Sequence, residues 1–357
     1  MKKLWVSLAI GVLMLATVVA NAADTKVNGR LYADWRLNTS DGADSENSFN
    51  LTRAYVTVKS KLSDYTAVRI TSDIRSTDAF DGYDVTLKYA YIDWMPKFAN
   101  DRLTVRFGLH PTPYIDVMNK IWNRRYLEKT VSDKYKYLTS SDLGAALILG
   151  LGENNKLGSL EFHVFNGSSY SDVEEMNKQK DFNFYGEINP LLNNADFKRT
   201  KLIGQAYLGT QNVMIDSTEE ASQYKNQLIS FGGVLGYRNT FDLGGEVNFH
   251  TMGEGYTPMQ VAIEDTKSSG MAFFGTLYFE DLVAENSSLR TLNLFGRYDI
   301  VDPNTDVDND GMNLMIAGIE CVPVKGFKAS VNYRVTSFED DSADSESYIY
   351  VNTLFKF

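Results

Sequence analysis

The sequence predicts an all-β fold: a single closed, antiparallel barrel of about sixteen strands that spans a membrane. Three observations support this prediction. Sixteen segments alternate apolar and polar residues with a period of two, the connections between them alternate in length, and no linker or helical period divides the chain after position 22. The chain of 357 residues is longer than one soluble core usually holds, whereas the size of a closed barrel is limited by its circumference.

The first 22 residues have the pattern of a secretory signal peptide. Lys2 and Lys3 precede an apolar run from Leu4 to Ala20, and Ala20-Asn21-Ala22 has the small residues of a cleavage site. An uncleaved anchor helix is the alternative, but the run is shorter than the ~20 residues that cross a bilayer. We therefore expect residues 1–22 to be removed and residues 23–357 to form the barrel.

The expected strands are the segments in which one face is apolar and the other polar. In one of them, Val68, Ile70 and Ile74 alternate with arginine, threonine and aspartate. In chain order the strands are Lys26–Asn38, Phe49–Lys61, Tyr65–Arg75, Tyr83–Met95, Arg102–His110, Asp142–Leu151, Ser159–Asn166, Asp181–Asn189, Lys201–Gln211, Gln227–Arg238, Phe241–Met252, Gly270–Glu280, Leu289–Val301, Met312–Val322, Phe327–Phe338 and Tyr348–Phe357.

The connections favour a membrane barrel over a large soluble β protein. Short turns such as Ser63-Asp64 and Asn239-Thr240 alternate with longer polar segments, and Pro190–Thr200 is a long member of the short set. Apolar faces rich in glycine would pack a soluble core badly, but they need no partner in lipid. Aromatic residues near strand ends indicate interfacial girdles: Trp35, Tyr65, Tyr91, Trp94 and Tyr348. The terminal Phe357 resembles the signal that such barrels present to their insertion machinery.

A barrel of about 16 strands leaves an aqueous channel, and one segment is long enough to narrow it. Pro111–Ser141 fits neither a strand nor a tight turn, and it lies between the fifth and sixth strands. With the first long connection outside, this segment is the third external loop. We expect it to fold into the barrel, because a loop of this length inside a compact domain is usually functional.

Basic residues predict a preference for anions in this channel. The candidate pore residues are Lys120, Arg124, Arg125, Lys129, Lys134 and Lys136 of the loop, together with Arg69, Arg75, Arg102 and Arg106 of the neighbouring strands. Alternatively, the loop cations pair with Asp116, Glu128 and Asp133 or face solvent. Several acids also fall on lumenal positions, which would weaken the selectivity or polarise the channel across its width: Asp73, Asp93, Glu161, Glu187 and Glu246.

Four short segments resemble the phosphate-selective porin O and P family of outer-membrane channels. They are Ala90-Tyr91-Ile92-Asp93-Trp94, Leu103-Thr104-Val105-Arg106-Phe107-Gly108, Thr112-Pro113-Tyr114 and Ser141-Asp142-Leu143-Gly144. The resemblance is clearest over residues 50–150. It implies a bacterial outer-membrane location, a homotrimer, an inward third loop and passage of phosphate. Ser141 stands where the family often has an arginine.

Asp306-Val-Asp308-Asn-Asp310-Gly311 matches the first half of a calcium loop, and Asp302 and Asn304 extend its alternation. Position twelve is Ala317 instead of glutamate, so a complete EF-hand is not expected. Structural calcium is one interpretation, and a solvated acidic hairpin is the other. No other cofactor is expected.

The remaining residues do not predict an enzyme or a nucleic-acid binder. His110, His163 and His250 are far apart in sequence and form no catalytic motif, and a net charge of -11 disfavours nucleic acid. We expect passive diffusion of small hydrophilic solutes with a bias toward anions such as phosphate. The alternative is a structural or adhesive barrel with partner-binding external loops.

Overall fold

The computed structural model describes residues 24–42, 46–77, 82–215, 220–253, 256–257, 260–261 and 265–357. The expected signal peptide, residues 1–22, lies outside the described residues.

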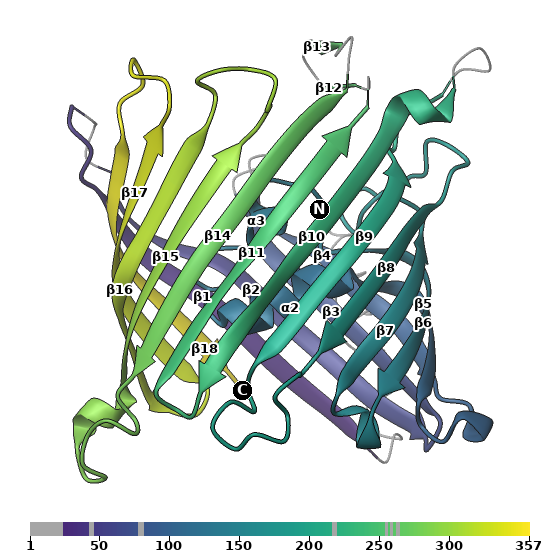
Figure 1. The fold of residues 1–357 in the computed structure, drawn as a ribbon, viewed down its shortest axis with the longest axis horizontal. Coiled ribbons are helices and arrows are strands. Elements are labelled where there is room, and N and C mark those ends of the chain that lie inside the picture. The colour runs from purple at the N-terminus through teal and green to yellow at the C-terminus, as the bar shows by residue number, and fades with distance from the viewer. Residues whose placement is uncertain are drawn as a thin grey trace, which may run out of the picture.

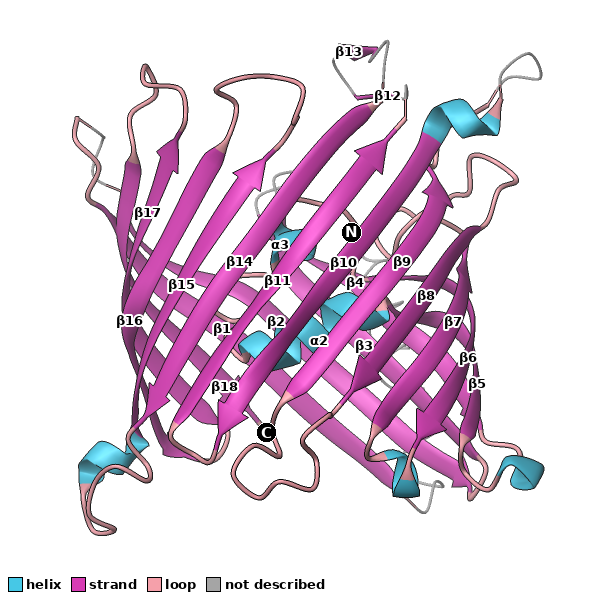
Figure 2. Ribbon diagram, viewed as in Figure 1, coloured by secondary structure: helices cyan, strands magenta, loops and turns pink. Residues whose placement is uncertain are grey.

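Within the described residues, sixteen antiparallel strands form one closed barrel (Figures 1 and 2). Each strand pairs with its neighbour in the chain, and pairing of β1 with β18 closes the ring. The strands are β1 (Thr25–Asn38), β2 (Asn47–Ser63), β3 (Thr66–Thr77), β4 (Gly82–Trp94), β5 (Leu103–Pro111), β6 (Ser141–Leu151), β7 (Gly158–Phe165), β8 (Asp181–Ile188), β9 (Lys201–Thr210), β10 (Lys225–Tyr237), β11 (Phe241–Met252), β14 (Thr266–Tyr278), β15 (Leu292–Asp302), β16 (Met312–Val324), β17 (Phe327–Phe338) and β18 (Glu346–Lys356). This confirms the predicted fold class.

The other elements lie in the connections. Two α-helices, α2 (Pro113–Trp122) and α3 (Val131–Lys134), lie between β5 and β6, and a small sheet of β12 (Tyr256–Thr257) and β13 (Gln260–Val261) lies between β11 and β14. Four short 3-10 helices are η1 (Lys97–Ala99), η2 (Glu153–Asn155), η3 (Ala221–Tyr224) and η4 (Ser288–Thr291). None of the described helices is long and apolar enough to cross a membrane.

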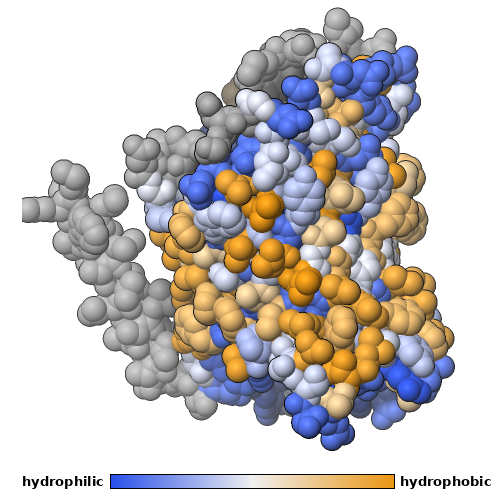
Figure 3. Space-filling model, turned by 90° about the vertical axis from the view of Figure 1, so that its left-hand side faces the viewer, coloured by the Kyte–Doolittle hydropathy of each residue, from blue (hydrophilic) through white to orange (hydrophobic). Residues whose placement is uncertain are grey.

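Burial is inverted relative to a soluble protein. Large apolar side chains face outward, and Phe107 and Phe231 are 68% and 57% exposed, whereas lumenal Asn183 and Asn248 are fully buried. On the face shown in Figure 3, apolar side chains gather in a belt between hydrophilic ends. Because so much apolar surface is unfavourable in water, the belt identifies the surface that contacts lipid.

The connections are mostly short at one end of the barrel and longer at the other (Figure 1). The two longest connections at the short end are residues 189–200, which we predicted to be long, and residues 279–291, which contain η4. The C-terminus also lies at this end, where Phe357 exchanges two backbone hydrogen bonds with Gly29.

Candidate functional site

Residues 112–140, which we call the inner loop, fold into the barrel as predicted. Figure 2 shows α2 and α3 within the ring of strands, and Tyr114 of α2 and Ser132 of α3 form hydrogen bonds with β10 and β11 on the far wall. The prediction did not include helices. Pro113 occupies the first turn of α2, where its missing N–H costs nothing, and Ile115, Met118 and Trp122 follow at helical spacing.

One face of α2 packs tightly on the wall formed by β10, β14 and β15. Tyr114 donates a hydrogen bond from its hydroxyl to the carbonyl oxygen of Phe231, 2.9 Å away. The ring of Trp122 lies 5.2 Å from that of Phe274, measured between centroids. Gly232 lies beneath the helix, and a Cβ there would meet the Met118 sulfur and the Tyr114 hydroxyl at 2.9 Å. The glycine therefore permits the close approach of α2.

Arg124 anchors the inner loop to the wall and does not face the channel, contrary to our prediction. Its side chain is 2% exposed, and Nη2 lies 3.3 Å from Glu320 Oε2. Nη1 also donates to the hydroxyl of Thr276, and the Tyr126 hydroxyl donates to Glu320 at 2.9 Å. The sequence could not show this, because Glu320 is 196 positions away.

The second helix, α3, docks through its N-terminus. The Val131 N–H donates to the Glu246 carboxylate at 2.8 Å, and the Ser132 hydroxyl donates to Asn248 at the same distance. On the same side, Arg297 Nη1 donates to the carbonyl of Lys129 at 2.8 Å. The inner loop therefore covers Glu246 and Glu320 and removes both carboxylates from the channel.

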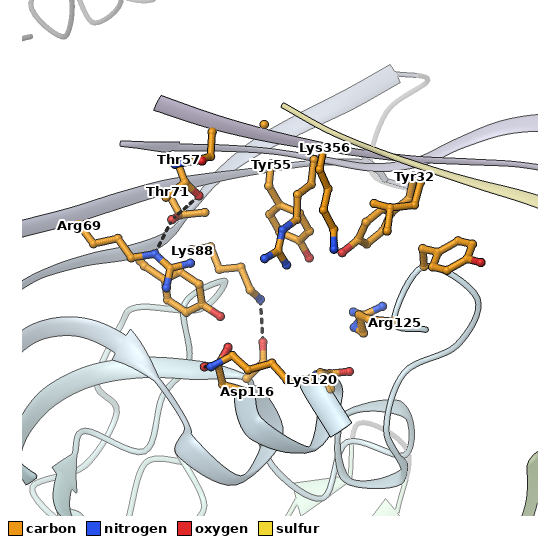
Figure 4. A pocket seen from close by; sticks show the side chains of 18 of the residues that line it. Tyr32, Tyr55, Thr57, Arg69, Thr71, Lys88, Asp116, Lys120, Arg125 and Lys356 are labelled. Atoms are coloured by element: carbon orange, nitrogen blue, oxygen red, sulfur yellow. Dashed lines mark hydrogen bonds and ion pairs between the residues drawn. The ribbon is translucent and has the colours of Figure 1, made fainter. Parts of the chain in front are cut away.

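The opposite face of the inner loop borders a cavity of about 470 Å³, which we call the pore cavity. Its second side is the wall made by β1, β2, β3, β4 and β18. Figure 4 shows Asp116, Lys120 and Arg125 of the inner loop facing the side chains of this wall across open space. The pore cavity is therefore space that the inner loop leaves open inside the barrel.

Positive charge dominates the pore cavity. Its lining includes seven basic side chains and two acidic ones: Arg30, Lys59, Arg69, Lys88, Lys120, Arg125 and Lys356, with Asp116 and Asp133. The five basic residues of the wall form no ion pair with any described residue, whereas both acids pair with basic residues of the inner loop. The charge that faces the channel is therefore positive, although the chain is acidic overall.

Four of these five basic wall residues were not predicted: Arg30, Lys59, Lys88 and Lys356. Alternation alone already placed Arg30 on the lumenal side, but the wall that the inner loop leaves uncovered could not be known. Alternation assigned Lys88 to the lumenal side less clearly. The β3–β4 register shifts between Thr71 and Ser72, so that Lys88 and Tyr89, adjacent in sequence, are both buried and line the cavity.

Tyrosine rings hold the lumenal arginines in place. The Arg69 guanidinium lies 4.3 Å from the centroid of the Tyr89 ring, and its Nε donates to the hydroxyl of Thr71 at 3.1 Å. Arg106 lies 4.2 Å from the ring of Tyr91, which we expected in an interfacial girdle and which faces the lumen instead. A guanidinium fixed in this way loses little conformational freedom when it binds an anion.

Of the ten predicted pore residues, only Arg69, Lys120 and Arg125 line the pore cavity. Arg125 and Lys129 pair with Asp133, Lys120 pairs with Asp116, and Lys134 pairs with Glu128, as in the alternative interpretation. Arg106 forms two hydrogen bonds with Asp93, and Arg75 contacts Tyr170. Lys136 is exposed with a left-handed backbone. Arg102 is exposed in the turn before β5, so it lies outside the strand in which we predicted it as a candidate pore residue.

Ion pairs also fix the charge of the inner loop. Burial raises the pKa of Glu128, but the charges of Lys134, Arg334 and Arg297 outweigh burial and lower the pKa to about 2. At Asp133, burial also raises the pKa, but the charges of Arg125 and Lys129 outweigh burial and the pKa is lowered. Both carboxylates therefore remain ionised, and the loop keeps its shape at neutral pH.

The lumenal acids do not form an acidic side of the channel. Glu161 lies 2.9 Å from the His163 imidazole, and Glu187 accepts a hydrogen bond from Lys201 at 2.7 Å. Asp73 is fully buried beside Arg53 and Tyr170. Each predicted acid is therefore paired or covered.

The acidic segment Asp302–Asp310 does not gather metal ligands. Across the part of the chain that the structure describes, no group of three or more His, Cys, Asp or Glu side chains is placed to hold a metal ion. Asn304 instead accepts a hydrogen bond from the Asp306 N–H, which forms a local turn. Calcium binding at Asp302, Asn304, Asp306, Asp308 and Asp310 remains an untested prediction.

Solved structures provide the comparison with known proteins. No family model matches the sequence, and no curated protein matches it. The fold is similar to an anion-selective porin of Comamonas acidovorans, with a TM-score of 0.65, 10% identity and coverage of 94% of this chain and 99% of the other. It is similar to OmpF of Salmonella typhi, with a TM-score of 0.64, 10% identity and coverage of 93% of this chain and 97% of the other. It is also similar to the outer-membrane channel DcaP of Acinetobacter baumannii, with a TM-score of 0.62, 11% identity and coverage of 94% of this chain and 98% of the other. The chain therefore has the barrel fold of bacterial outer-membrane porins.

Proposed function

We propose that this protein is an outer-membrane porin that lets small hydrophilic solutes diffuse passively and favours anions. The observation that carries the proposal is the pore cavity, with seven basic and two acidic side chains, five of the basic ones without an ion-pair partner among the described residues. Fixed positive charge in a narrow channel raises the local concentration of anions and repels cations.

Phosphate is the preferred solute in this proposal. Arg30 and Arg69 offer planar forks that match phosphate or carboxylate oxygens, and Lys59 and Lys356 add point charges beside them. The resemblance to the phosphate-selective porin O and P family points the same way. The Comamonas structure is named an anion-selective porin, which supports anions as the broader class.

The location and assembly follow from the same proposal. A barrel with an apolar belt and a closing strand that ends in Phe357 suits insertion into the bacterial outer membrane by the barrel-insertion machinery. We infer a homotrimer, since OmpT of Vibrio cholerae, another similar structure, is described in a trimer form. Cross-linking in detergent would test this assembly.

Conductance of the purified protein in planar bilayers tests the function. Stepwise single-channel currents are expected, and a salt gradient should give a reversal potential of the sign for anion permeation. Phosphate should reduce chloride current at low concentration if it binds in the cavity. A barrel without conductance would support the adhesive alternative, and a cation-selective reversal potential would overturn the anion preference.

A further inference from the structure

A second external connection, residues 166–180 between β7 and β8, also reaches into the barrel. Asp142, the first residue after Ser141 in β6, holds its start: the carboxylate accepts hydrogen bonds from the N–H groups of Leu143 and Gly167, both at 2.7 Å. Gly167 has a φ of +86°, a left-handed conformation that turns the chain sharply. We call residues 166–180 the strap.

Tyr170 of the strap packs on the wall beyond the inner loop. Its hydroxyl donates to Asp73 Oδ2 on β3 at 3.2 Å and accepts a hydrogen bond from Arg75 Nη1 at 3.4 Å. The Lys88 ammonium lies 4.2 Å from the centroid of the Tyr170 ring. Tyr170 therefore joins the strap to the wall that carries Asp73 and Lys88, although Tyr170 and Asp73 are 97 positions apart in sequence.

Asp73 is a lumenal acid on the same wall as the basic residues of the pore cavity. It follows Arg69 and Thr71 on the lumenal face of β3, and those two residues line the pore cavity. Asp73 does not line the cavity, because it is fully buried under Tyr170 and beside Arg53, whose Nε is 3.5 Å from Oδ1. Tyr170 thus separates a carboxylate from the channel at the level of Lys88.

We propose that Tyr170 determines the selectivity of the channel by covering Asp73, so that permeating cations cannot contact its carboxylate beside Lys88. This inference rests on the proposed porin function and adds a specificity residue outside the inner loop. Without the ring, the Asp73 carboxylate becomes accessible to water and offers cations a site of direct contact in the channel. The packing of Lys88 on the ring is lost in the same step.

Bilayer recordings on Tyr170→Ala, Asp73→Asn and the double variant test the inference. Tyr170→Ala should lower the anion-to-cation permeability ratio by roughly two- to threefold, the effect of one unit charge across a few ångströms of water-filled channel. It should also raise conductance, because bulk is removed. Adding Asp73→Asn to Tyr170→Ala should restore the ratio and leave the higher conductance.

Matched variants separate covering from general disturbance. Tyr170→Phe keeps the ring and should retain most of the selectivity, and Val173→Ala, an exposed position on the same strap, should behave as wild type. Heat-modifiable migration on gels would verify that each barrel is folded. An anion-selective wild type with an unchanged ratio in Tyr170→Ala overturns this inference alone. A lowered ratio that Asp73→Asn does not restore also overturns it, whereas a non-conducting wild type overturns the porin function itself.

Discussion

Arg124 of the inner loop and Glu320 of β16 form a buried ion pair across the barrel interior, with 3.3 Å between Nη2 and Oε2. The two side chains are 2% and 1% exposed, and Tyr126 and Lys328 also contact the carboxylate. The pair joins the segment after α2 to the wall opposite the pore cavity. The pair therefore holds the inner loop against that wall and away from the pore cavity.

Arg124→Ala should destabilise the protein by roughly 3–5 kcal/mol, because it leaves the Glu320 carboxylate buried without its main partner. The melting temperature in detergent should fall, and single-channel currents should become noisier as the inner loop moves. Combining Arg124→Ala with Glu320→Gln should recover part of the stability. A melting temperature equal to that of the wild type would argue against an anchoring role.

Lys59→Gln and Arg69→Gln should each reduce the anion-to-cation permeability ratio by about twofold, since each removes one unpaired charge from the pore cavity. Arg102→Gln is the matched control, because this arginine is exposed in the turn before β5. Reversal potentials in a salt gradient measure the effect. Equal losses in all three variants would contradict a selective role for the cavity wall.

Gly232→Val should push α2 away from β10 and toward the pore cavity, because a Cβ at this position already meets Met118 and Tyr114 at 2.9 Å. Overpacking of this kind costs about 1–3 kcal/mol, and conductance should fall as the helix narrows the channel. Gly296→Val is the control, since the nearest neighbouring atom to a Cβ there is 3.9 Å away. Unchanged conductance in Gly232→Val would show that α2 does not set the width.

Glu128→Gln should lower the melting temperature at pH 7, and the difference from the wild type should vanish at low pH. The folded-state pKa of about 2 is below the unfolded value, so ionised Glu128 stabilises the fold above pH ~4.5. That stabilisation is lost progressively as the pH falls from ~4.5 to ~2. Melting curves across this interval provide the test, and a difference that persists at pH 2 would refute the ion-pair explanation.

If residues 302–310 bind calcium, added calcium should raise the melting temperature by several degrees, whereas a solvated acidic hairpin should leave it unchanged. The comparison is between added calcium and chelator, with Asp308→Ala plus Asp310→Ala as the control. A calcium-dependent rise of several degrees that the control lacks would support a site in the 302–310 loop.

The barrel could be predicted from the pattern of residues alone. Period-two alternation assigns each side chain to one of two faces of a strand. Strands that follow one another in the chain also pair in the barrel wall, so the sixteen strands and the inward third loop were predictable. Long polar connections carry no such constraint, and the helices α2 and α3 were missed although Pro113 and the spacing of Met118 and Trp122 carried a signal.

The charges that face the channel could not be predicted, because they depend on contacts between residues that are distant in sequence. Arg124 and Arg125 are adjacent in sequence, yet one pairs with Glu320 in the wall and the other lines the pore cavity. Asp73 has the same alternation signal as Arg69, yet Tyr170 from a distant connection covers it. The electrostatics of a channel depend on which charges are paired and covered. The residues that pair with Arg124 and cover Asp73 lie about 100 or more positions away in sequence, and strand periodicity gives no information about such distant contacts.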